Sequence, residues 1–334
     1  MLGLRTLGFS GWLVVLVLVV LALSLISLSV GTYRGLSLPK VVKGLLKGGL
    51  SRADLSILDR RAARTVAALI AGLGLASSGI GLQYVLRNPL AEPYLLGISA
   101  GAALGVLVSL AFGYYMNPVA LHATALALGL AGFSVVIATS AFTGLSPLSV
   151  IIAGIAVSYA ISSINIVLTM LLGPKVHGAL AWLYGTVAYV LWDEVTYSAP
   201  VVIVAVAWLL LRARAVGTLI LGEEVAESLG VRVKRLRVEV VIASALATSS
   251  VVAFAGPIGF IGLAAPWIAR LLVGSDFRAS YITSLAVGPA LVVGSDIGAR
   301  LVMPIESAPL TAITALIGAP VLIYLLVRRS SWGG

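Results

Sequence analysis

The stretch VLRNPLAEPYLLGISAGAALG, residues 85–105, places a charged turn with two prolines between two long apolar runs. Proline starts a helix readily and interrupts one elsewhere, so this turn is expected to end one helix and begin the next. Beyond the turn, glycines recur every fourth residue, at Gly97, Gly101 and Gly105. Glycines at this spacing let a neighbouring helix backbone approach closely. The stretch therefore predicts a helix that packs tightly within a bundle of helices.

The whole chain is unusually apolar. Its 334 residues are 60% hydrophobic and 10% charged, whereas soluble domains carry about 25% charged residues. A membrane-spanning helix needs about 20 mostly apolar residues, and in lipid the backbone polar groups of each span must be satisfied internally, which favours helices. The sequence predicts an all-α polytopic membrane protein with about ten spans in a single domain, residues 1–334. The runs are 11–31, 63–84, 94–113, 118–141, 147–172, 195–211, 238–256, 258–274, 280–302 and 309–327.

Basic residues do not set the orientation of these spans. The two most basic loops, 32–61 and 212–237, follow the first and sixth runs and so lie on opposite sides of the membrane. The 22 Lys and Arg residues divide almost evenly between the sides, so the positive-inside rule gives no answer. Within the first loop, segment 38–50 has lysines at turn-like spacing beside apolar residues. It fits a basic amphipathic helix on the membrane surface or a connector whose lysines snorkel.

Candidate catalytic and metal-binding residues are few. The sequence GISAG at 97–101 matches the nucleophile motif G-x-S-x-G, but Ser99 lies in an apolar helical run without the strand, histidine and acid that a hydrolase needs. The chain has no cysteine, and His122 and His177 have no second metal ligand at a suitable spacing. Nothing matches the phosphate-binding loop G-x-x-x-x-G-K-[ST], so any ATP would bind another chain. We expect no catalytic residue, metal site or cofactor in this chain.

Two groups of charged residues are more informative. Asp296 and Arg300 are four residues apart in the ninth run, so they share a helix face and can pair. Ionisable groups at such depth are functional candidates, and a structural ion pair fits equally well. Segment 221–237, LGEEVAESLGVRVKRLR, is acidic at its start and basic at its end. It favours a helix that docks on a soluble partner, or else a solvated loop helix.

Five ordered segments carry a family resemblance. They are LQYVLRNPLAEPYLLGISAGAALG (82–105), LGEEVAESLGV (221–231), FAGPIGFIGLAAPWIARLLVG (254–274), GSDIGARL (294–301) and TALIGAP (314–320). In this order they resemble FecCD-type permeases, the membrane subunits of ABC importers for iron–siderophore complexes, haem and vitamin B12. One departure is Pro266-Trp267, where the family commonly has Pro-His.

The resemblance implies the type II ABC importer permease fold, in the cell membrane, with both termini cytoplasmic. It also implies that a second copy of the chain, two ATPase subunits that bind ATP and Mg²⁺, and an extracytoplasmic substrate-binding protein complete the transporter. Membrane lipid surrounds it, and no nucleic acid is involved. The cargo would be an iron chelate or a related metal complex such as cobalamin or haem, with an oxyanion such as molybdate also open.

The resemblance further assigns roles to particular residues. Segment 221–231 would be a cytoplasmic coupling helix, and 38–50 an external basic loop. Coupling to the ATPase is expected at Glu223, Glu224, Ala226, Leu229 and Gly230. Docking of the binding protein is expected at Arg61, Arg64 and Arg300, and the translocation pathway at Gly154, Ser158, Ser162 and Ser163. The alternative is an ion-coupled secondary transporter, for which only Asp296 and Glu306 could supply the coupling acid.

Overall fold

The computed structural model describes residues 8–31, 33, 35–114, 117–143, 146–173, 182, 184–303 and 308–330. Over these residues the chain is helical and contains no strand. In chain order the elements are α1 (Phe9–Ser29), α2 (Leu38–Lys47), α3 (Arg52–Val85), η1 (Pro93–Leu96), α4 (Ile98–Ala111), α5 (Pro118–Ala141), α6 (Pro147–Leu172), α8 (Trp192–Leu211), α9 (Ala213–Thr218), η3 (Leu219–Leu221), α10 (Glu223–Ser228), α11 (Val233–Ala255), α12 (Ile261–Val273), α13 (Phe277–Val302) and α14 (Leu310–Ser330).

Each of the ten predicted runs corresponds to one helix. Within the described residues, seven helices are long and apolar enough to cross a membrane, namely α1, α3, α5, α6, α8, α11 and α13. Two further apolar helices, α4 and α12, are shorter, and α14 is apolar over residues Leu310–Pro320. The all-helical, multi-span prediction is confirmed, and α2 confirms a helix within segment 38–50.

The largest difference in helix bounds is at α3, which begins at Arg52 rather than near residue 63. The reason is local, because Ser51 and Asp54 form a reciprocal capping box at its start. The Ser51 hydroxyl accepts the Asp54 N–H at 3.1 Å, and the Asp54 carboxylate accepts the Ser51 N–H at 3.3 Å. As a result, Arg61 and Arg64 lie inside a helix and not at its entrance.

The glycine prediction holds at two of three positions. A Cβ on Gly101 would collide with the carbonyl of Leu128, and one on Gly105 with the carbonyl of Thr124, so the backbones of α4 and α5 touch. Gly97 is different, because it sits between η1 and α4 with φ +75°, a conformation that glycine adopts without strain. The third span therefore starts at Ile98 and not at 94.

The chain is irregular between α11 and α12, close to the boundary between the predicted runs 238–256 and 258–274. The carbonyls of this segment that lack a partner within a helix accept hydrogen bonds from other parts of the protein. The Thr186 N–H donates to Ala255 O at 2.7 Å, and the Thr311 hydroxyl donates to Pro257 O at 2.9 Å. The hydroxyl of Thr314 donates to Gly259 O at 2.9 Å. Irregular backbone inside the bundle is thus stabilised by the Thr186 backbone and by two side chains of α14.

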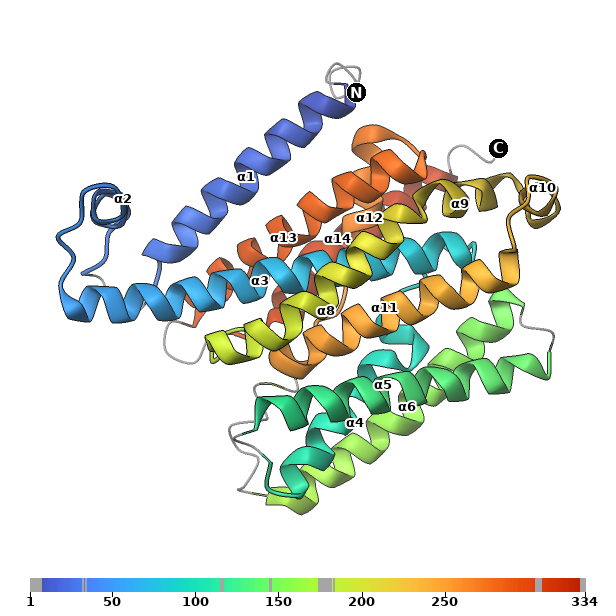
Figure 1. Ribbon diagram of the computed structural model, residues 1–334, viewed down its shortest axis with the longest axis horizontal. Helices are drawn as coiled ribbons and strands as arrows, with labels where there is room; N and C mark the ends of the chain where they lie inside the picture. Colours follow the sequence, from blue (N-terminus) through green and yellow to red (C-terminus); the bar gives the residue numbers. More distant parts are fainter. Residues whose placement is uncertain are drawn as a thin grey trace.

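Figure 1 shows how the helices separate two ends of the molecule. The helix α2, the start of α3 and the start of α8 lie at one end, and α10 lies at the other. Helices α4, α5 and α6 form a group on one flank, and α1 lies on the opposite flank against α13. Long α3 runs through the middle and packs against α8, α11, α12 and α13.

Candidate functional site

A cavity of about 410 Å³ lies between η1, α4 and α6. Two of the predicted pathway residues, Ser158 and Ser162, line it from α6. Its other lining residues are apolar, aromatic or neutral polar, and none is charged: Tyr94, Ser99, Ala100, Ala103, Asn165, Ile166, Thr169, Met170, Tyr184 and Pro257. Such a lining can hold a bulky, weakly polar solute without binding it tightly.

Helix geometry explains which α6 residues reach the cavity. Ser158 and Ser162 are one turn apart, and Asn165 and Thr169 continue the same face at helical spacing. These last two were missed, although the 3.6-residue period could have found them. Gly154 is buried one turn before Ser158 but does not line the cavity. Ser163 lies on another face, is exposed, and donates its hydroxyl to Tyr159 O at 2.9 Å.

Hydrogen bonds fix the cavity wall. The Ser158 hydroxyl accepts the Gly97 N–H at 2.9 Å and is 3.3 Å from Tyr94 O. The Asn165 amide donates to Ala100 O at 3.1 Å, and its buried Oδ1 has no partner among the described residues. Ser99 also lines the cavity, but His122 pairs with Ser198 and with the Pro118 carbonyl instead. His122 is therefore not positioned to act as a general base for Ser99.

The predicted coupling segment is a short helix between two left-handed glycines. Helix α10 covers only Glu223–Ser228, less than the expected 221–231, because Gly222 and Gly230 have φ of +118° and +83°. One side of it is anchored: Ala226 is fully buried, and the Glu223 carboxylate lies 2.8 Å from the Arg237 guanidinium. The orientation of α10 on the bundle is thus fixed.

The other side of this segment is exposed. Leu221 and Leu229 are 63% and 60% exposed, Val225 is exposed, and so is the acidic Glu224. Beside it lies a groove of about 550 Å³ between the end of α3, η3 and α12, lined in part by Arg87, Trp267 and Arg270. Apolar side chains interleaved with charges on one exposed surface are typical of a protein-docking site.

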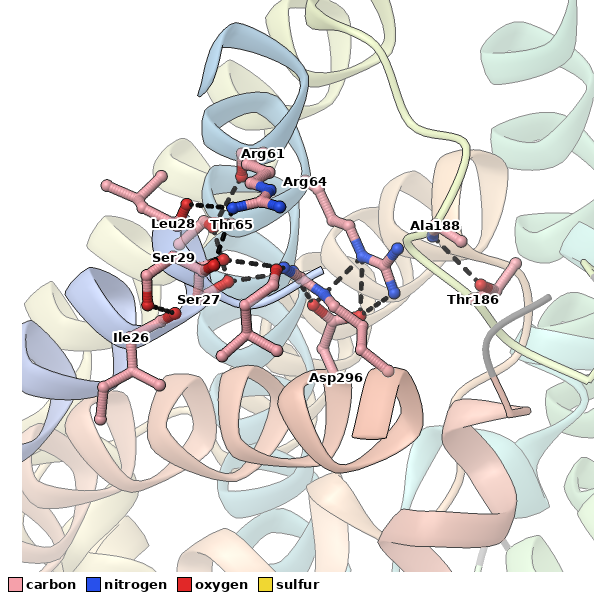
Figure 2. A network of polar contacts seen from close by, with 12 residues as sticks. Ile26, Ser27, Leu28, Ser29, Arg61, Arg64, Thr65, Thr186, Ala188 and Asp296 are labelled. Atoms are coloured by element: carbon pink, nitrogen blue, oxygen red, sulfur yellow. Dashed lines mark hydrogen bonds and ion pairs between the residues drawn. The ribbon is translucent and has the colours of Figure 1, made fainter. Parts of the chain in front are cut away.

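At the opposite end, Asp296 of α13 faces Arg64 (Figure 2) and also pairs with Arg300. Arg64 Nε donates to Asp296 Oδ1 at 2.9 Å and to its Oδ2 at 3.2 Å, and Arg64 Nη2 donates to Oδ1 at 2.6 Å, so the guanidinium contacts both carboxylate oxygens. Asp296 Oδ2 pairs with Arg300 one helical turn away. Asp296 is 1% exposed. The predicted Asp296–Arg300 pair is confirmed, and the sequence had no local signal for the contact with Arg64.

Arg61 and Arg300 are also bound to the end of α1. Arg61 donates to Leu28 O and Ser29 O at 3.0 and 2.8 Å. Arg300 donates to Ser27 O and Val30 O at 2.8 and 3.0 Å. The last carbonyls of a helix lack partners within it and carry partial negative charge, which guanidinium groups satisfy. Arg61 is 7% exposed and Arg300 5%, whereas the Arg64 side chain is 14% exposed.

The structure thus brings the three predicted docking arginines together and gives each an internal partner: Arg61 and Arg300 bind the end of α1, and Arg64 binds Asp296. In this conformation neither Arg61 nor Arg300 presents its guanidinium to a partner. Arg64 is the most exposed of the three. Glu306, which the secondary-transporter alternative would use, lies outside the described residues.

The amino-acid sequence of this chain is similar to those of known proteins. The model of the FecCD transport family matches residues 17–328. The chain belongs to the FecCD transport family. A FecCD relative, the ferric enterobactin transport system permease protein of Escherichia coli, is 37% identical, with 96% of this chain and 95% of that protein covered. The cobalamin import system permease protein of Halobacterium salinarum is 36% identical over 80% of this chain and 72% of its own length.

A solved structure supports the same assignment. It is described as an inward-facing metal-chelate type ABC transporter, and it superposes with a TM-score of 0.80 at 28% identity, covering 96% of this chain and 99% of that one. As a FecCD permease, the protein is a multi-pass transport subunit of ABC importers and not an enzyme. Membership of this family favours an ABC importer over the alternative of an ion-coupled secondary transporter.

Proposed function

We propose that two copies of this chain form the membrane pathway for a metal chelate, with an iron–siderophore complex as the first choice of cargo. The observation that carries this proposal is the uncharged cavity lined by Ser158 and Ser162. A large chelate needs a wide, weakly polar wall, whereas a small oxyanion is usually held by arginine or lysine, which this lining lacks. Relatives named for ferric enterobactin and cobalamin transport favour the same class of cargo.

The energy would come from ATP, bound with Mg²⁺ by two separate ATPase subunits on the α10 surface. The exposed side chains around Glu224 and Leu229 and the adjoining groove support docking there. In this proposal α10 is cytoplasmic. The ten helices then leave both termini cytoplasmic in the cell membrane, with α2 on the external side.

The substrate-binding protein would dock at the other end, near Arg64. Because Arg61 and Arg300 are engaged by the end of α1, they would act by holding α1 and Asp296 in place. Arg64 also binds Asp296, but it is the most exposed of the three, and its permanent charge would in addition attract a carboxylate of the partner. Docking is tested by Arg64→Gln, which keeps a hydrogen-bond donor near Asp296 and leaves its pair with Arg300 in place. It should weaken association while the melting temperature stays unchanged, with Arg60→Gln on the same helix as the control. Unchanged association, or association lost only together with stability, would contradict docking at Arg64.

The pathway is tested by narrowing the cavity. Ser162→Trp should block it and lower uptake of a ferric siderophore into proteoliposomes at least tenfold, while ATP hydrolysis continues. Ser134→Trp is the matched control, because it makes the same change at an exposed serine of α5 that does not line the cavity. Equal uptake by the two variants would contradict the proposal.

A further inference from the structure

Two hollows adjoin along the seam between α8 and α11. The first, about 330 Å³, lies at the α10 end of the seam, and Arg212, Arg232 and Arg235 line it. The second, about 530 Å³, runs further along the same two helices past Val204, Trp208 and Ile242. Glu239 lines both hollows, so they are neighbours. We call the first the basic hollow, because three arginines line it, and the second the apolar groove.

The charges of the basic hollow are only partly balanced. Glu239 pairs with Arg212 at 2.8 Å and with Arg235 at 2.9 Å, so one carboxylate serves two guanidinium groups. Arg232 makes no ion pair with any described residue, and the buried Nε–H of Arg212 has no hydrogen-bond partner among them. The first turn of α11, which follows Arg232, contains no acidic residue. The hollow is suited to an anion.

The groove has the features of a surface that faces lipid tails. Val204 is 68% exposed and Ile242 is exposed, although both are large and apolar. Trp208 sits between the groove and the basic hollow, with the Arg212 guanidinium 5.1 Å from its ring centroid. Tryptophan and arginine occur together at the boundary between acyl chains and headgroups. The seam therefore presents, in order, an acyl-chain surface, an interface residue and an anion site.

We propose that this seam binds one anionic phospholipid, with its phosphate among Arg212, Arg232 and Arg235 and an acyl chain along the α8–α11 groove. An acidic loop of a protein partner could fill the basic hollow but would not explain the apolar groove beside it. Placing the lipid in the cytoplasmic leaflet rests on the proposed function. Gly230 and Val231, which follow α10, also line the hollow, so the lipid would contact the segment that couples to the ATPase.

The test measures lipid binding directly, so its result does not depend on transport. The full-length chain is titrated with dioleoyl phosphatidylglycerol, and bound lipid is counted by native mass spectrometry. The double variant Arg232→Gln/Arg235→Gln should weaken binding about 25-fold, because the loss of each arginine weakens binding about fivefold. The control Arg214→Gln/Lys234→Gln removes the same charge from neighbouring exposed residues that do not line the hollow, and it should bind normally. Arg232→Gln alone should cost about fivefold and leaves the Glu239 pairs intact.

Two further measurements distinguish a bound phospholipid from a simple anion or a protein partner. Ile242→Trp fills the groove and should weaken phosphatidylglycerol binding, and dioleoyl phosphatidylcholine should bind the unmodified chain less tightly. Glycerol phosphate that bound as well as the lipid, with Ile242→Trp without effect, would overturn the proposal in favour of a simple anion site. Equal losses in the two double variants would also overturn it. So would unchanged lipid binding with lost ATPase association, which would make the hollow a protein contact.

Discussion

The two ends of the molecule use the same kinds of charged residue under different solvent exposure. Around Asp296 the charges are buried: the side chains of Asp296 and Arg300 are 1% and 4% exposed. Around α10 the Glu223 side chain is 40% exposed and Arg87 37%. A buried charge must keep its partners because leaving one unpaired is costly, whereas an exposed pair contributes little and can exchange partners. The comparison indicates a rigid end around Asp296 that holds helices together and a more adaptable surface around α10.

The strongest test of this comparison is Asp296→Asn. The substitution keeps the shape of the side chain but leaves Arg64 and Arg300 in a buried site without their carboxylate. We expect a loss of about 3–5 kcal/mol in unfolding free energy, measured by chemical denaturation in detergent. Glu227→Gln, on the exposed α10, removes one negative charge as the control and should leave stability unchanged. A stable Asp296→Asn variant would show that the network is not structural.

Arg61→Met should have the next largest effect. It removes donors to Leu28 O and Ser29 O at the end of α1 and should cost about 2 kcal/mol, because hydrogen bonds to charged groups contribute about 1.5–3 kcal/mol. The loss should appear as faster hydrogen exchange at the end of α1. Arg60→Met is the matched control, since Arg60 is exposed on the same helix. Equal exchange in both variants would contradict the capping role.

Glu223→Gln should have a smaller effect on stability. It weakens the 2.8 Å pair with Arg237, and a pair this exposed contributes about 0.5 kcal/mol. The melting temperature of the purified chain should fall only slightly. A loss as large as that of Asp296→Asn would remove the contrast between the two ends.

Glu224→Lys should not change stability at all, because Glu224 is exposed and has no ion pair with a described residue. Its effect is expected on function: the charge reversal should lower ATPase association and transport-coupled ATP hydrolysis. Co-purification with the ATPase measures this. Normal assembly and normal transport would show that the coupling surface lies elsewhere.

The positions of the helices were predictable because they depend on local sequence. Apolar runs, the turn at 85–93 and the break after Gly256 all appear as helices and interruptions at nearly the expected places. The start of α3 was misplaced because the capping box of Ser51 and Asp54 outweighs the polar composition of the first turns. The cavity-facing residues Asn165 and Thr169 were within reach of the same periodic reasoning that selected Ser158 and Ser162.

The sequence by itself determined that this chain is a bundle of membrane helices, because spans are encoded by continuous apolar composition and local punctuation. It also determined the Asp296–Arg300 pair, whose partners are one turn apart on a single helix. Only the tertiary structure decided that Arg61 and Arg300 cap α1 and that Arg64 joins Asp296 across 232 positions of sequence. The burial of a side chain and its long-range contacts depend on how the helices pack. The spacing of residues along one helix does not specify which other helix it packs against.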